Sequence, residues 1–411
     1  MKEINKMPCN PNIKFASIKC IIIKKKYRQL IIIIGLIISL NIIISEKSYK
    51  FNKFYQKRTI ELINLNYTKS QYKIIGLKYL NKIKKSKLNN ITNKINTPKI
   101  TIIIPIYNCQ KTIELTYKSI HFQNFKEIEI ILVNDKSPDN SSLILDKLQG
   151  LDRRITIINN KKNMGTLYSR SIGALNANGE YIIGLDNDDL FLFEKTLETI
   201  YLNAKINDFD IAEMRSFNIK SYNPKYNQIR DGYFIHHQNN LILHQPELGR
   251  FSISYKNKLA FTDHYIWGKC IKSSIYKEAV KLLGPERYSH YNCWTEDLSI
   301  VFILFNIAKS FIFLNLFGIF HILSKSTTTN LLSKHKKLLT DIFYLGILFD
   351  FSKDDFITKK FIAQFALSFP KRKIKKLDVK NKIYFKSIIK KLIKCKYITQ
   401  KYKDKIIQKF H

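Results

Sequence analysis

The sequence predicts an α/β fold in which helices flank a mostly parallel sheet. Between residues 99 and 185, four short apolar runs alternate with three segments of helical spacing. Strands that alternate with helices are typical of a parallel sheet with crossover helices. Polar residues follow each apolar run, and in such sheets the carboxyl ends of the strands are where ligands bind. The sequence also predicts an amino-terminal transmembrane helix and a helical carboxyl-terminal region.

We predict strands in the four apolar runs because they are rich in β-branched residues, as buried parallel strands are. The predicted strands are 99–105, 128–133, 154–158 and 181–185. Apolar residues recur every three or four positions in the predicted helices 112–122, 141–148 and 167–177. Pro98 ends the stretch before the first strand, and Asn178-Gly179 closes the last of these helices.

The composition is strongly basic, with a formal net charge of +38 over 411 residues. Lysine is spread over nearly the whole chain together with many Ile and Asn, which is the bias that an A/T-rich coding sequence produces. No nucleic-acid recognition motif accompanies the charge, so we expect no nucleic-acid partner. The six cysteines form no Cys-x-x-Cys pair, which argues against zinc and thioredoxin-like sites.

A membrane anchor is predicted at residues 30–45, after a basic cytoplasmic leader at 1–29. Leu30 to Ile44 would span about 22 Å as a helix, and flanking lysines can extend that reach. A signal peptide is the alternative, but no Ala-x-Ala-like cleavage site follows. A buried core helix is the other alternative, and unbroken isoleucine is unusual for one. We therefore predict a single-pass membrane protein with a partly helical stem at 46–97.

Three carboxylates are crowded into four residues directly after the fourth predicted strand, at Asp186, Asp188 and Asp189. Mutual repulsion makes this crowding costly unless a cation lies among them. Mg²⁺ and Mn²⁺ prefer carboxylate oxygens, and Mg²⁺ sites commonly add substrate phosphates. A solvated turn is the alternative, because Asp and Asn dominate turns. The position at a strand end favours a site for a metal and a diphosphate.

Seven short motifs follow one another between residues 104 and 297. They are Ile-Pro-Ile-Tyr-Asn at 104–108, Val-Asn-Asp-Lys-Ser-Pro-Asp at 133–139, Asn-Met-Gly at 163–165, Ser-Arg-Ser-Ile-Gly at 169–173, Ala-Asn-Gly-Glu-Tyr-Ile at 177–182, Leu-Asp-Asn-Asp-Asp at 185–189 and Trp-Thr-Glu-Asp at 294–297. In this order they resemble the family-two nucleotide-sugar glycosyltransferases of GT-A fold. The resemblance implies a catalytic domain at 98–330 that transfers a sugar, with inversion, from a UDP-sugar or similar donor to an acceptor hydroxyl.

The resemblance also implies roles for donor-side residues. Pro105, Tyr107 and Asn108 would line the base pocket, and Asp135 would accept a hydrogen bond from the base edge. From the residues alone, Asp135 could instead cap the following helix through an Asx-turn. Arg170 would lie near the diphosphate or pair with an aspartate.

The metal would be Mn²⁺ or Mg²⁺. By the same resemblance Asp188 would contact it, and Asp186 would contact the metal or the ribose. His321 is a candidate third ligand, or else a structural histidine in an apolar run. We expect Asp189 to be a helix-capping neighbour rather than a ligand. The family often has Asp, Gly and Asn where this chain has Asn134, Lys136 and Ser171, and Lys136 leaves the nucleoside contacts open.

An inverting transfer needs one general base to deprotonate the acceptor hydroxyl. The resemblance implies that Asp297 is this base and that Glu296 supports it. From the residues alone, these carboxylates could instead stabilise the start of the apolar helix at 300–307. Candidate acceptor contacts are Trp267, Lys269 and Trp294.

Residues 331–411 are expected to be helical and basic, lying on an anionic membrane surface or facing solvent. The acceptor would be a glycan, a lipid or a protein. Sequons at Asn66, Asn90 and Asn140 favour a luminal catalytic domain in the endoplasmic reticulum or Golgi. A catalytically inactive GT-A-fold protein that serves as a membrane-bound binding or scaffold protein is the alternative function.

Overall fold

The computed structural model describes residues 67–410, except for 233–240, 246, 252–253, 256–257, 260–264, 285–295, 324–333, 353 and 355. The predicted leader, the anchor at 30–45 and the first part of the stem lie outside the described residues. So do Trp294 and the side chain of Glu296. Among the helices that are described, none has both the length and the apolar character that crossing a bilayer requires.

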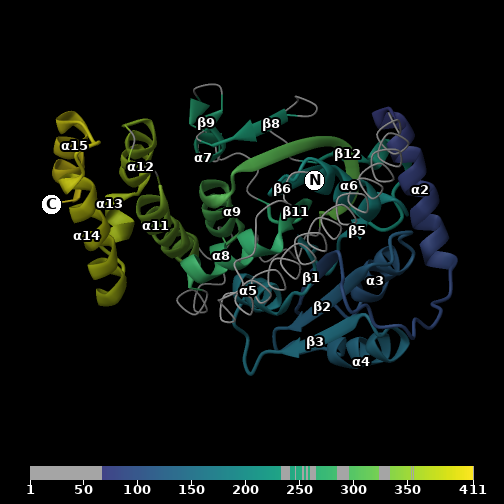
Figure 1. The fold of residues 1–411 in the computed structure, drawn as a ribbon. Coiled ribbons are helices and arrows are strands. Elements are labelled where there is room, and N and C mark those ends of the chain that lie inside the picture. The colour runs from purple at the N-terminus through teal and green to yellow at the C-terminus, as the bar shows by residue number, and fades with distance from the viewer. Residues whose placement is uncertain are drawn as a thin grey trace, which may run out of the picture. The chain divides into compact units, whose positions relative to one another are not determined.

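The first half of the central sheet has the predicted parallel arrangement (Figure 1). Its strands are β1 (Ile100–Ile106), β2 (Ile128–Asn134), β3 (Ile155–Asn159) and β4 (Tyr181–Gly184). They lie side by side in the order β3-β2-β1-β4, and every pair is parallel. β1 and β4 are buried along their whole length, as their unbroken apolar sequences predict.

The second half of the sheet corrects the prediction of a mostly parallel sheet. β11 (Lys269–Lys272) lies antiparallel between β4 and β6 (Ile211–Ile219), and β12 (Ser310–Ile322) then runs parallel to β6. Three short strands pair antiparallel with these: β5 (Leu190–Phe191), β7 (Arg230–Asp231) and β8 (Leu241–His244). A single crossover helix would bring the next strand in parallel. The chain instead reaches β11 through the long segment that follows β6, and β11 enters antiparallel.

The long segment between β6 and β11 holds the remaining short elements in the described part of the chain. These are a 3₁₀ turn at Tyr226–Gln228, α7 (Glu247–Phe251), and a small separate pair of strands, β9 (Ser254–Tyr255) and β10 (Lys258–Leu259).

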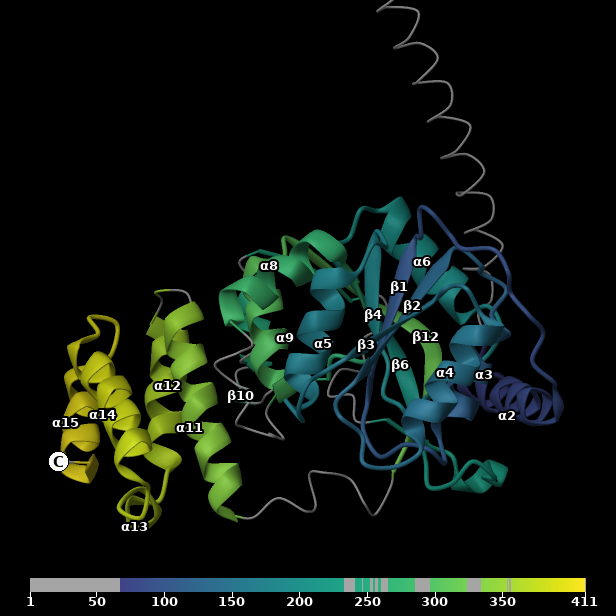
Figure 2. The same ribbon diagram turned by 90° about the horizontal axis from the view of Figure 1, so that it is seen from below.

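Helices cover both faces of the sheet (Figure 2). One layer contains α2 (Lys69–Lys85), α3 (Ile113–His121), α4 (Ser141–Leu151) and α6 (Thr196–Ile206). The other contains α5 (Thr166–Asn176), α8 (Ser273–Leu283) and α9 (Glu296–Ile307). The three predicted helices α3, α4 and α5 are confirmed, with ends within three residues of the prediction. The end of the predicted stem forms α2, which buries Tyr72, Tyr79 and Ile83.

The middle of α9 is apolar on every side. Each residue from Ile300 to Phe305 is buried, with an exposed fraction of at most 2%. A helix of this kind must be covered all round. Its cover on the far side is α11 (Lys334–Phe351), which packs directly on it. The confirmed helical region continues with α12 (Phe356–Ser368), α13 (Lys371–Ile374), α14 (Val379–Lys394) and α15 (Gln400–Phe410). One apolar core runs from Ile103 in β1 to Ile406 in α15.

At Gly179, between α5 and β4, the backbone lies close to the backbone of β1. A Cβ on Gly179 would lie 2.5 Å from the backbone nitrogen of Thr101 and 2.7 Å from the carbonyl carbon of Ile100. The Gly179 amide also donates a 2.8 Å hydrogen bond to the Thr101 hydroxyl. A side chain here would push β4 away from β1, so glycine sets the position at which β4 enters the sheet.

We expect Gly179→Ala to lower the free energy of unfolding by about 1–3 kcal/mol, because backbone atoms would have to move. Gly150→Ala is the matched control. It lies in α4 with nothing within 4 Å of an added Cβ, and alanine there should raise stability by about 0.5–1 kcal/mol. Urea unfolding of both variants measures these changes. Equal stability of Gly179→Ala and the wild type would contradict the close approach of β1 and β4.

Candidate active site

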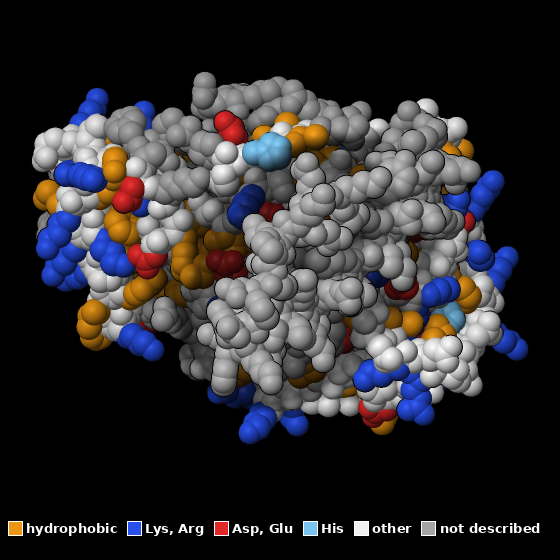
Figure 3. All heavy atoms as spheres, viewed as in Figure 1, with side chains coloured by type: hydrophobic (Ala, Val, Ile, Leu, Met, Phe, Trp, Pro, Cys, Tyr) orange, Lys and Arg blue, Asp and Glu red, His pale blue; other side chains and the backbone are white. Residues whose placement is uncertain are grey.

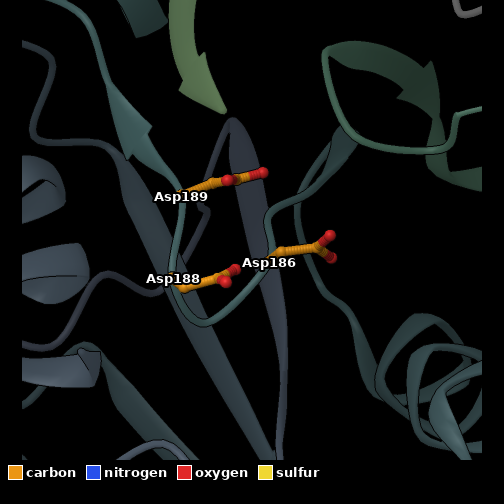
Figure 4. A group of neighbouring side chains, drawn as sticks. All are labelled: Asp186, Asp188 and Asp189. Atoms are coloured by element: carbon orange, nitrogen blue, oxygen red, sulfur yellow. The ribbon is translucent and has the colours of Figure 1, made fainter. Parts of the chain in front are cut away.

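The loop after β4 brings three carboxylates together (Figure 4). Asp186, Asp188 and Asp189 point to the same side of this loop, and one oxygen from each lies within 4.8 Å of the others. Three such oxygens form a donor set that suits a hard divalent cation. The residues present therefore fit Mg²⁺ or Mn²⁺, as the crowding of carboxylates in the sequence predicts.

Neighbouring elements hold the backbone of this loop in place. The amide of Leu185 donates to the Ile103 carbonyl at 3.0 Å. The side-chain amide of Asn187 donates to the Pro105 carbonyl at 2.9 Å, and the Tyr222 hydroxyl donates to the Asp188 carbonyl at 2.8 Å. The carboxylates are thus positioned before any ligand arrives, which reduces the entropy lost on binding.

Asp189 caps no helix, contrary to our expectation. It is fully buried and is followed by the strand β5. Its carboxylate accepts a 2.9 Å hydrogen bond from the Ile322 amide, and both of its oxygens lie 3.1 Å from Nδ1 of His321. The partners lie on β12, more than 130 residues along the chain, so local sequence could not reveal them. Asp189 ties the loop to β12.

The cluster carries more negative charge than the described side chains balance. Burial, followed by the charges of Asp189 and Asp186, raises the pKa of Asp188 to about 8. Burial lowers the pKa of His321, but the neighbouring Asp189, Asp186 and Asp188 outweigh it and raise this pKa to about 9. A protonated His321 therefore balances Asp189, whereas no described cation pairs with Asp188.

His321 is fixed by its surroundings as well as by Asp189. Its ring stacks on Trp267 with centroids 4.8 Å apart, and Trp267 stacks in turn on Tyr265 at 4.7 Å. The Nδ1 atom faces Asp189, so this nitrogen pairs with a carboxylate in the structure. Its role as a metal ligand stays a prediction, and the observed contacts give it a role in holding the acidic loop.

Arg170 connects the acidic loop to α9. This buried arginine lies on α5. One of its guanidinium nitrogens donates a hydrogen bond to Asp186, and another donates one to Asp297. The structure shows the pairing with aspartates that the sequence suggested, and a place near the diphosphate stays a prediction. Burial raises the pKa of Asp297, the Arg170 charge lowers it, and Asp186 raises it again. The net direction is upward, which suits a carboxylate that must accept a proton.

Asp135 organises the loop before α5. Its carboxylate accepts hydrogen bonds from the side chain of Asn160 at 2.7 Å and from the amides of Met164 and Gly165 at 2.7 and 2.8 Å. The local turn that we considered for Asp135 is not among these bonds; Asn134 instead accepts from the Ser137 amide, three residues on, at 3.1 Å. Asp135 thus holds the Asn-Met-Gly motif beside the carboxyl end of β2.

The other predicted donor-side residues lie at the ends of β1 and β2. Pro105 is in β1 and supplies the carbonyl that holds Asn187. Tyr107 is 48% exposed, so its ring is available for a contact. Asn108 has a positive φ of 51° and donates its amide to Ser137 at 2.7 Å. Lys136 also has a positive φ, of 56°, a backbone conformation that favours glycine.

Lys269 is placed differently from the prediction of an acceptor contact. It is fully buried in β11, with its ammonium 3.0 Å from Glu213 and 2.7 Å from the Tyr265 carbonyl. A buried lysine needs such partners, and this placement favours a structural role. Trp267 is also buried, with an exposed fraction of 4%.

Tyr222, Asn160 and Glu213 were not singled out from the sequence, because only the folded chain brings them to the site.

Comparison with known protein families matches the part of the chain that contains most of these site residues. The family described as "Glycosyl transferase family 2" matches residues 101–270. Residues 101–270 therefore match a glycosyltransferase family 2 domain. The domain includes Asp135, Arg170 and the acidic loop, whereas Asp297 and His321 lie beyond the matched residues.

Individual relatives match over shorter stretches. Glycosyltransferase GlyG of Streptococcus pneumoniae serotype 4 is 34% identical over 113 residues, which are 28% of this chain and 37% of GlyG. The GalNAc(5)-diNAcBac-PP-undecaprenol beta-1,3-glucosyltransferase of Campylobacter jejuni is 36% identical over 96 residues, which are 23% of this chain and 31% of that protein. The chain therefore matches about a third of the length of these relatives.

Among solved structures, S. aureus TarS 1-349 in complex with UDP-GlcNAc has a TM-score of 0.51 and 14% identity. The match covers 74% of this chain and 82% of that chain. At this identity the likeness shows the fold alone, which is GT-A-like. The glycosyltransferase fold expected from the sequence is therefore confirmed, with a mixed sheet.

The raised pKa of Asp188 predicts that divalent-ion binding releases a proton. Below about pH 8, the carboxyl must lose its proton before an oxygen can bind a cation, so Mn²⁺ affinity should rise with pH and level off above that value. Titration calorimetry in buffers of different ionisation enthalpy measures the proton release. We expect about one proton per Mn²⁺ near pH 6.5 and none in Asp188→Asn. Affinity independent of pH in the wild type would contradict the assignment.

Proposed function

We propose that this chain is an inverting, metal-dependent glycosyltransferase that moves a sugar from a nucleotide-sugar donor to an acceptor hydroxyl. The observation that carries the proposal is the bridge made by Arg170. A single guanidinium joins Asp186, in the candidate donor site, to Asp297, the candidate base. Two carboxylates from distant parts of the chain therefore belong to one site.

The donor would bind at the carboxyl ends of β1, β2 and β4. A divalent ion held by Asp186 and Asp188 would neutralise charge on the leaving nucleotide. Asp135 supports this side of the site by holding the Asn-Met-Gly loop, and Tyr107 is exposed for a nucleoside contact. The UDP-GlcNAc complex of TarS favours a UDP-sugar donor.

Asp297 would accept the proton of the acceptor hydroxyl as it attacks the sugar. It lies in the first turn of α9 with a side chain that is 15% exposed. Limited exposure and a raised pKa make it a stronger base than a solvated carboxylate. One such base on the acceptor side is what an inverting transfer requires. The name of the Campylobacter relative favours a lipid-linked glycan as acceptor.

The inactive scaffold is the weaker alternative, because a protein that only binds has no need of Asp297 and its arginine partner. Membrane anchoring through residues 30–45, and a luminal location in the endoplasmic reticulum or Golgi, remain part of the proposal. They rest on sequence alone, since those residues are outside the described part of the chain.

Asp297→Asn tests the base. The amide keeps the shape but cannot take a proton, so we expect transfer to fall by about 10²–10⁴-fold while donor binding is retained. Release of UDP from UDP-sugars with Mn²⁺ and an acceptor measures turnover, and fluorescence titration with UDP measures binding. Asp188→Ala should lose both. Asp146→Asn, an exposed carboxylate on α4, is the control and should match the wild type. Full transfer by both site variants would refute the proposal.

Arg170→Gln tests the link between the two halves of the site. The Arg170 charge lowers the pKa of Asp297, so its removal should raise that pKa. The carboxylate is the active form of a base, and the acid limb of the pH–rate profile should therefore move up by about 1–3 pH units. Arg170→Lys, which keeps the charge, should move the acid limb less. An unchanged limb in Arg170→Gln would show that Asp297 is not the group that titrates.

A further inference from the structure

The last forty described residues are far more basic than the rest of the chain. Residues 371–410 contain 16 Lys and Arg and only two Asp, a net charge of +14, whereas the other 371 residues carry the remaining +24. A compositional bias that acts on the whole gene would not concentrate charge in this way. Lys and Arg side chains are spread over the surface of the carboxyl-terminal helices, on the left of Figure 3. The charge therefore marks a particular surface.

The structure arranges part of this charge as a stripe along α14. Six of its eight exposed residues recur every three or four positions, so they lie on one side of the helix; the other two are Lys380 and Lys391. We call these six the α14 stripe: Val379, Ile383, Lys386, Ser387, Lys390 and Lys394. The opposite side of α14, with Phe385, Ile389 and Leu392, is buried in the core. The stripe thus faces outward because the helix is anchored from behind.

Two aliphatic side chains at the start of the stripe are unusually exposed. Val379 is 73% exposed and Ile383 is 63% exposed, one turn apart, although the helix buries other apolar residues. Basic residues flank them in the sequence, because α13 contributes Lys371, Arg372 and Lys373, all exposed. Apolar side chains set among cations suit a surface that is anionic and has an apolar interior beneath it.

We propose that the α14 stripe and α13 bind the surface of an anionic lipid bilayer. Lysines would lie against lipid phosphates, while Val379 and Ile383 would enter the boundary between headgroups and acyl chains, as on interfacial amphipathic helices. A nucleic acid or another soluble polyanion would use the cations but gain nothing from the two aliphatic side chains. The interaction is separate from sugar transfer, because it involves none of the residues of the candidate site.

Binding of the full chain to vesicles tests the proposal. Wild-type protein is floated with vesicles of phosphatidylglycerol and phosphatidylcholine in equal parts, or of phosphatidylcholine alone. A lysine beside an anionic surface contributes about fivefold to partitioning. Lys386→Glu/Lys390→Glu/Lys394→Glu should therefore bind anionic vesicles at least about a hundredfold more weakly. All variants share residues 1–66, so a difference between them arises from the substituted helix.

Lys78→Glu/Lys82→Glu/Lys85→Glu is the matched control, because these three lysines are exposed on another helix, α2. It makes the same change in net charge and should retain binding. Val379→Ser/Ile383→Ser should weaken binding to anionic vesicles severalfold and leave binding to heparin and duplex DNA unchanged. Thermal unfolding checks that each variant is folded, and salt titration of the wild type gives a measurement free of substitutions.

Equal vesicle binding by the wild type and the α14 triple variant would overturn the proposal, and so would equal loss in the α2 triple variant. It would also be overturned by unchanged vesicle binding of Val379→Ser/Ile383→Ser together with tighter binding of the wild type to heparin or DNA than to anionic vesicles. That result would identify a soluble polyanion as the ligand. Binding of the wild type that is insensitive to salt would also count against it, because lysine–phosphate attraction is screened.

Discussion

The active-site half of this fold depends on the balance of buried negative charge at the end of β4. Three carboxylates on one short loop would repel one another, and burial makes their ionised forms costlier still. Two cations oppose that cost, and each comes from a different part of the chain. His321 reaches Asp189 from β12, and Arg170 reaches Asp186 from α5. The acidic loop therefore contacts elements from both halves of the fold, α5 and β12.

This balance explains why structural and chemical roles are shared among few residues. Arg170 also holds Asp297, so α9 is positioned by the same guanidinium that stabilises the acidic loop. Asp189 has a structural role, because its hydrogen-bond partners are His321 and the Ile322 amide. Asp186 and Asp188 are more exposed than Asp189 and remain the carboxylates suited to a cation. One buried member of the cluster secures the loop, and its neighbours are left for a ligand.

The sequence predicted what is encoded locally. The strands β1 to β4 are short β-branched runs separated by single helices, so their type, order and direction followed from spacing and from the rules of parallel sheets. The acidic loop and the Arg170 motif could be found because each is contiguous. The antiparallel insertion of β11 could not be predicted, since it depends on a long return of the chain. The buried pair of Lys269 and Glu213, like that of Asp189 and His321, joins residues far apart in sequence. Pattern alone could not tell an internal lysine from one that faces a substrate.

The carboxyl-terminal helices show how the core constrains the site from a distance. Asp297 begins α9, and α9 is apolar on every side, so its position depends on what covers it. That cover is α11, which α12 and α14 hold in turn. An α9 without this cover would expose six consecutive apolar residues and would lose the packing that directs Asp297 toward Arg170. The helices that carry the basic surface outside are thus the ones whose inner faces keep the candidate base in place. The helix that presents the α14 stripe therefore belongs to the same apolar core as α9.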